Sequence, residues 1–209
     1  MSDLHITVSG TKRLLTAGKR HTHNIVVTAE GGDNHYDTFW DAYQQNGSRV
    51  NYTYAFYNHG WNDQSYNPKY DIAPTECNGL FSYSHITDTK VIVDLSNTKK
   101  DRVSNVFYYC YRLKTIRKLI LTENVTFDIA FFGYCPALEN ITFEGVIGQN
   151  LSLMDSPLLT DASVQSVIDH LQNLTGQSAC TLTLHATVGG KLTAAQKTAI
   201  TAKNWTLVY

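Results

Sequence analysis

The chain has 209 residues, of which 43% are hydrophobic and 17% charged, and its formal net charge is −1. This composition is typical of a folded protein with one or two domains, and it excludes a disordered or low-complexity chain. Lysine and arginine are spread thinly and no stretch approaches the roughly 18 consecutive apolar residues of a membrane span, so we expect neither a nucleic-acid partner nor a transmembrane segment.

Residues 1–31 are predicted to form a small β-module. Leu4, Ile6 and Val8 alternate with polar residues, and Ser9-Gly10 supplies a turn before a second extended stretch. The first residues have neither the basic region nor the apolar region of an export signal, so we expect no signal peptide.

The segment 32–55 is predicted to be a helix and capping segment. Its aromatic residues have the spacing i, i+3, i+4 and i+7 of one helix face: Tyr36, Phe39, Trp40 and Tyr43. We expect this face to cover the first of the repeats that follow, because the end of a repeat array needs a cap.

Residues 56–158 contain a degenerate repeat of 25 or 26 residues. An apolar or small residue followed by Phe recurs at Ala55-Phe56, Leu80-Phe81, Val106-Phe107 and Phe131-Phe132. In the best-matched pair of copies, Phe107-x-x-Cys110-x-x-Leu113-x-x-Ile116 corresponds position by position to Phe132-x-x-Cys135-x-x-Leu138-x-x-Ile141. Each copy leads into a run of strand type, within 91–95, 119–121 and 141–143. Repeats of this length with strand-type segments are typical of solenoids.

The segment 57–70 is a polar loop that carries aromatic residues. We take Tyr57, Trp61, Tyr66 and Tyr70 as candidate ligand-binding residues. Loops with Trp and Tyr on a rigid scaffold are common binding sites. The alternative is that these rings pack against neighbouring repeats.

Residues 159–209 are predicted to form a C-terminal α/β cap. Thr160-Asp161 begins a helix that we expect to end at Thr175-Gly176. A strand at 181–184 follows, then a helix with a capping box at Thr193 and Gln196, and a last strand at 205–208.

At the start of the chain, Ile6-Thr7-Val8-x-Gly10 with Leu15-Thr16-Ala17-Gly18-Lys19 is similar to a short β-module of phage tail-associated proteins. The repeat unit, followed by an apolar strand and Asn124-Val125-Thr126, resembles the BspA-like leucine-rich repeats, which occur in bacterial prophage and phage proteins. The closing segment, from Leu159-Thr160-Asp161 to Trp205-Thr206-Leu207, is similar to the closing module of such proteins. The resemblance implies an α+β fold, a short leucine-rich-repeat β-solenoid with an N-terminal β-module and helix cap and a C-terminal β-α-β cap. It also implies a protein made in a bacterial cytoplasm and associated with a virion or surface, where it binds other macromolecules.

Catalytic and metal-binding patterns are not found. The chain has no Gly-x-Ser-x-Gly and no phosphate-binding loop, its four cysteines have no zinc spacing, and His21-x-His23 lacks further ligands. Cys110 and Cys135 share a repeat position and are interpreted as small buried residues. We therefore expect no enzyme, no metal and no cofactor.

The expected function is non-enzymatic recognition of a protein or a cell-surface glycan by the repeat scaffold. One alternative is a structural or assembly protein that forms a homo-oligomer and binds no host ligand. A more remote alternative is an enzyme that acts on glycans.

Overall fold

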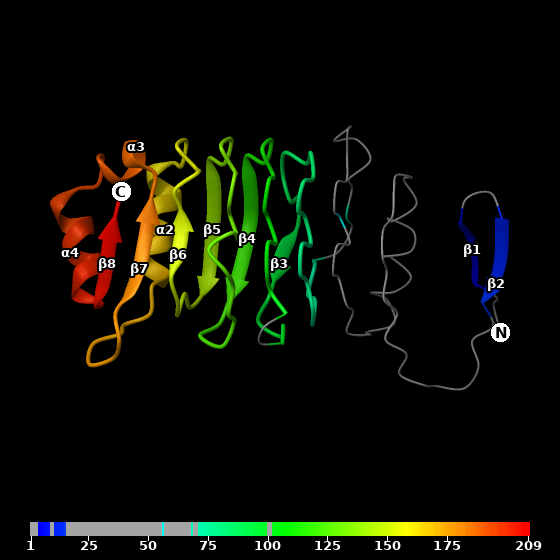
Figure 1. Ribbon diagram of the computed structural model, residues 1–209, viewed down its shortest axis with the longest axis horizontal. Helices are drawn as coiled ribbons and strands as arrows, with labels where there is room; N and C mark the ends of the chain where they lie inside the picture. Colours follow the sequence, from blue (N-terminus) through cyan, green and yellow to red (C-terminus); the bar gives the residue numbers. More distant parts are fainter. Residues whose placement is uncertain (1–3, 9–10, 16–55, 57–67, 69–70, 100–101) are drawn as a thin grey trace.

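The structure is a computed structural model that describes residues 4–8, 11–15, 56, 68, 71–99 and 102–209 (Figure 1). The helix and capping segment predicted at 32–55 lies outside these residues. The first described part is an antiparallel hairpin of β1 (Leu4–Val8) and β2 (Thr11–Leu15). Both strands lie within the predicted β-module, one before and one after the residues Ser9-Gly10.

The remaining described strands form two separate parallel sheets of three strands each, and short helices lie beside them (Figure 1). The first sheet has the order β3 (Ile92–Asp94), β4 (Thr115–Leu121) and β5 (Asn140–Gly145). The second has the order β6 (Leu151–Leu153), β7 (Cys180–Leu184) and β8 (Trp205–Val208). The helices are α2 (Asp161–His170), α3 (Ala186–Gly189) and α4 (Ala194–Ala202).

The prediction of a leucine-rich-repeat β-solenoid with terminal caps is wrong. The strands do not form one continuous stack, because they divide between two small sheets that share no strand. Helix α2 lies beside β5 at the point of division. The backbone N–H of Ile141 donates to Ser163 Oγ at 3.0 Å, and that of Phe143 donates to Ser166 Oγ at 2.8 Å. Helix hydroxyls therefore occupy the edge of β5 where a fourth strand would otherwise pair.

Phenylalanines one repeat apart nevertheless lie in a single column through the core. The ring centroids of Phe56 and Phe81 are 5.1 Å apart, those of Phe81 and Phe107 are 5.4 Å apart, and those of Phe107 and Phe132 are 5.5 Å apart. All four rings are buried. Backbone hydrogen bonds join successive turns, as from Phe81 N to Val106 O at 2.8 Å. The sequence repeat thus sets the packing of side chains and turns.

The C-terminal segment has the predicted elements in the predicted order, with one additional short helix, α3, after β7 and with one boundary displaced. Helix α2 begins after the N-cap Thr160, and the predicted capping box joins Thr193 and Gln196 at the start of α4. Helix α2 ends at His170, however, and does not extend to Thr175-Gly176. The chain turns there because Leu171 forms a parallel bridge with Ile147, whose N–H donates to His170 O at 2.8 Å.

Candidate functional site

The predicted ligand-binding residues, Tyr57, Trp61, Tyr66 and Tyr70, lie outside the described residues. That site stays a prediction. The described residues hold a different group of aromatic side chains, which is built on the same repeat.

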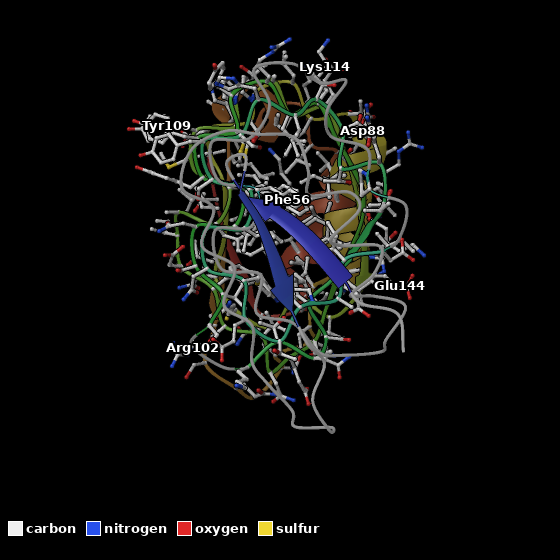
Figure 2. The ribbon with its side chains drawn as sticks, turned by 90° about the vertical axis from the view of Figure 1, so that its right-hand side faces the viewer. Phe56, Asp88, Arg102, Tyr109, Lys114 and Glu144 are labelled. Carbon is white, nitrogen blue, oxygen red and sulfur yellow. The ribbon has the colours of Figure 1, made fainter. Side chains whose placement is uncertain are left out.

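Tyr83, Tyr109 and Tyr134 form what we call the tyrosine ladder. Each follows a phenylalanine of the buried column by two residues. The rings of Tyr83 and Tyr109 stack with centroids 4.9 Å apart and planes 6° apart, and those of Tyr109 and Tyr134 stack at 4.3 Å and 20°. Figure 2 shows Tyr109 at the outer edge of the molecule, on the side away from Asp88 and Glu144. The ladder is therefore an ordered aromatic row on the surface.

A left-handed backbone turn directs each ladder tyrosine outward. Tyr83, Tyr109 and Tyr134 have φ values of 59°, 58° and 57°, which residues with a Cβ adopt at a cost of about 1–2 kcal/mol each. The next residue in each turn is buried in the core: Ser84, Cys110 and Cys135. Strained backbone of this kind persists where surrounding contacts fix it and is frequent at functional sites.

Hydrogen bonds from the next turn hold each left-handed residue. Tyr83 N donates to Tyr108 O at 2.8 Å, and Tyr109 N donates to Gly133 O at 2.8 Å. Tyr134 N donates to Asp155 Oδ2 at 2.9 Å. The ladder is thus fixed by backbone contacts as well as by stacking of its rings.

Tyr108 packs across the ladder. Its ring is nearly perpendicular to those of Tyr83, Tyr109 and Tyr134, with centroids 5.7, 4.7 and 5.9 Å away. Gly133 makes room for it, because a Cβ at Gly133 would lie 3.0 Å from Tyr108 Cδ2. Desolvation, with neighbouring tyrosines, raises the pKa of both Tyr108 and Tyr109, so both hydroxyls carry their protons at neutral pH.

A second pair flanks the ladder. The Tyr111 hydroxyl lies 2.6 Å from His85 Nε2, and their rings meet edge to face. His85 is buried and Tyr111 is 46% exposed. Burial, and to a lesser degree the charge of Arg112, lowers the pKa of His85. The neutral imidazole of His85 therefore holds the hydroxyl end of the exposed Tyr111 side chain in place.

Exposed apolar side chains continue past the end of the ladder. Tyr134 is 51% exposed, Met154 is 50% exposed and Leu158 is 53% exposed. Met154 and Leu158 lie on either side of a turn that is bonded to the ladder through Asp155 and through Ser156 Oγ, which donates to Cys135 O at 3.2 Å. Two half-exposed aliphatic side chains therefore lie in a turn that is bonded to the ladder, and exposed apolar side chains that gather together are typical of interaction sites.

The thiols near the ladder are not suited to nucleophilic chemistry. Cys110 Sγ donates to Phe81 O at 2.9 Å, and Cys135 Sγ donates to Phe107 O at 3.0 Å. Burial raises the pKa of Cys110 to about 12 and raises that of Cys135. Within the described part of the chain, no group of three or more His, Cys, Asp or Glu residues could hold a metal ion.

The tyrosine ladder was missed in the sequence, although its signal was present. Tyr83, Tyr109 and Tyr134 recur 26 and 25 residues apart, each at the second position after Phe. The repeat was aligned only on its Phe, Cys, Leu and Ile positions, which are the buried ones. A tyrosine that recurs at a fixed position after the buried phenylalanine of each repeat indicates a row of tyrosines on the surface.

Comparison of the chain with protein-family models, curated proteins and solved structures found no match. The resemblance to BspA-like repeats therefore stays a prediction. None of the described helices has the length and apolar character needed to cross a membrane.

Proposed function

We propose that this protein is a non-enzymatic recognition protein that binds another macromolecule through the tyrosine ladder. The observation that carries the proposal is the outward stacking of Tyr83, Tyr109 and Tyr134 on strained, hydrogen-bonded turns. A phage or prophage origin and an association with a virion or cell surface remain part of the proposal, on the strength of the sequence resemblance alone.

Pre-organisation supports a binding role for the ladder. Tyrosine offers a large amphipathic contact area and has few rotatable bonds, so it loses little conformational entropy when it is bound. In the ladder, stacking and the hydrogen bond from each backbone N–H fix the rings further. A partner would meet an ordered surface, and little of the binding free energy would go into ordering it.

Binding of the labelled, purified protein to intact bacterial cells tests the proposal. We expect saturable binding that Tyr109→Ala weakens more than tenfold, because truncation of a central aromatic residue is often this costly in an interface (about 2 kcal/mol or more). Tyr209→Ala is the matched control, because Tyr209 is also about half exposed but lies after β8. Circular dichroism and thermal unfolding verify that both variants fold. Equal binding by Tyr109→Ala and the parent protein would refute a role for the ladder.

A second candidate, an assembly protein that forms a homo-oligomer, is favoured by the outer edge of β8. Within the described residues β8 pairs only with β7, and its residues Trp205–Val208 carry no charge. Uncharged edge strands can pair with other strands wherever a neighbouring element, here α4, leaves their backbone accessible. Light scattering across a concentration series tests this candidate: a constant monomer mass would exclude it, and a dimer lost in Thr206→Lys would support it.

A further inference from the structure

The geometry of the tyrosine ladder bears on which class of macromolecule it binds, and this inference rests on the proposed function. Glycans and proteins use aromatic side chains differently. A sugar ring packs its C–H groups on an open aromatic face, which carries the negative part of the ring quadrupole. A protein partner also uses ring edges, hydroxyl groups and neighbouring aliphatic side chains.

The faces of the ladder rings are largely taken up by one another. Tyr109 stacks on Tyr83 through one face and on Tyr134 through the other. Tyr83 and Tyr134 each use one face in the same stack. What the ladder presents to the outside is a row of ring edges and phenolic hydroxyls. Such a row is a poor platform for stacked sugar rings.

Polar side chains beside the ladder already have partners within the protein. Asp155 Oδ2 accepts from Tyr134 N at 2.9 Å, and His85 Nε2 lies 2.6 Å from the Tyr111 hydroxyl. Sites for small polar ligands such as sugars hold several convergent polar groups that point into a hollow. The polar groups of this surface instead hold its own aromatic residues in position.

Two exposed aliphatic side chains lie in the turn that is bonded to the end of the ladder. Met154 and Leu158 are each about half exposed, at the end of the ladder marked by Tyr134. Tyrosine and methionine are enriched in the cores of protein interfaces, where lysine and glutamate are depleted. Methionine adapts its shape to a partner's apolar groups. Together with the ladder, these residues make a surface rich in tyrosine and aliphatic side chains, with the Asp155 carboxylate bound to Tyr134 N beside them.

We propose that the ligand of the tyrosine ladder is a protein surface whose contact region is largely apolar. Tyr83, Tyr109 and Tyr134 supply ring edges and hydroxyls at the centre of the contact. Met154 and Leu158 extend it with aliphatic surface.

The test uses the same labelled protein on intact bacterial cells that have been treated in two ways. Protease digestion removes surface proteins, and periodate oxidation cleaves the vicinal diols of surface glycans. We expect protease to abolish binding and periodate to leave it unchanged. Met154→Lys and Leu158→Lys should each weaken binding to untreated cells about tenfold or more, because a charge is then placed in an apolar contact. Val208→Lys is the control, because it places the same charge on a similarly exposed residue of β8.

The outcomes separate this inference from the proposed function. Binding that survives protease treatment, or that periodate abolishes, overturns the proposal that the ligand is a protein. If Tyr109→Ala still weakens that binding, the ladder remains the binding site, and its ligand is a glycan or a lipid. Binding unaffected by Met154→Lys and by Leu158→Lys also overturns the proposed contact. A folded protein that binds no cells at all refutes both proposals.

Discussion

The hydroxyl of Ser163 accepts a hydrogen bond from the backbone N–H of Ile141 at 3.0 Å and donates one to the carbonyl of Glu139 at 2.9 Å. One helix side chain thus satisfies two backbone groups at the edge of β5. Ser166, three residues later in α2, satisfies a third backbone group, the N–H of Phe143. Sheet edges expose unpaired backbone groups, and here a helix covers them. This relationship is what ends the first sheet at three strands.

Ser163→Ala is expected to lower the free energy of unfolding by about 1–3 kcal/mol, because a buried backbone N–H loses its partner. Urea denaturation followed by circular dichroism measures the change. Thr198→Ala is the control, because it also removes a hydroxyl from a helix but at an exposed site of α4. Equal effects of the two substitutions would show that α2 does not secure the β5 edge.

Gly145→Ala should destabilise the protein much more than Gly176→Ala. The two glycines have nearly the same φ, +81° and +80°, so the backbone strain of an alanine is similar at both, about 1–2 kcal/mol. A Cβ at Gly145 would lie 2.0 Å from Leu121 O, whereas a Cβ at Gly176 meets nothing within 4 Å. We expect the difference in the free energy of unfolding to exceed about 2 kcal/mol. A smaller difference would mean that β4 and β5 separate there without cost.

Tyr109→Gly is expected to be at least as stable as Tyr109→Ala. Both variants lose the stacked ring, but only glycine adopts a φ of 58° without strain from a Cβ. In a regular helix alanine is instead more stable than glycine. Ala195→Gly in α4 therefore serves as the comparison, with an expected decrease of up to about 1 kcal/mol in the free energy of unfolding. Thermal unfolding of the three variants measures the order. If Tyr109→Ala is clearly more stable than Tyr109→Gly, the left-handed turn is contradicted.

Alkaline pH should destabilise the protein through its buried thiols. Burial raises the pKa of Cys77 and of Cys110 from 9.0 to about 12. Between these values the unfolded chain loses protons that the folded chain keeps, so the free energy of unfolding falls as pH rises above about 9. Each thiol contributes at most about 1.4 kcal/mol per pH unit to this fall.

Cys110→Ser tests the alkaline prediction. Serine fits this repeat position, since Ser84 holds it one turn earlier, and it does not titrate in this range. We expect a flatter dependence of the free energy of unfolding on pH between 9 and 11, measured by urea denaturation at several pH values. Cys180→Ser, at a partly exposed thiol, should flatten the dependence less. An unchanged slope in Cys110→Ser would contradict the raised pKa of Cys110.

Local signals in the sequence were sufficient for several of the short elements, although not for α3. The alternating runs near Val93, Leu119 and Ile141 all became strands, and Thr193 with Gln196 began a helix as a capping box. These features depend on residues close in sequence, which a periodicity or a cap motif can reveal. The repeat also located the buried phenylalanines, because phenylalanines one repeat apart pack ring on ring.

The division into two sheets could not be predicted in the same way. Ser163 and Ser166 resemble ordinary helix serines, and their partners Ile141 and Phe143 are 22 and 23 residues earlier. Such a contact depends on how α2 packs, which local sequence does not determine. The left-handed turns were equally hidden, because glycine or asparagine usually marks such a turn and tyrosine does not.

The column of phenylalanines has a consequence for how the chain tolerates changes in length. Phe81, Phe107 and Phe132 meet one another ring on ring, so each turn offers its neighbour the same surface. Loss or duplication of a whole turn would bring like surfaces together again. A single inserted residue between two of these phenylalanines would instead move one ring out of the column and its ladder tyrosine with it. Length variation among descendants of this chain should therefore occur in steps of one repeat.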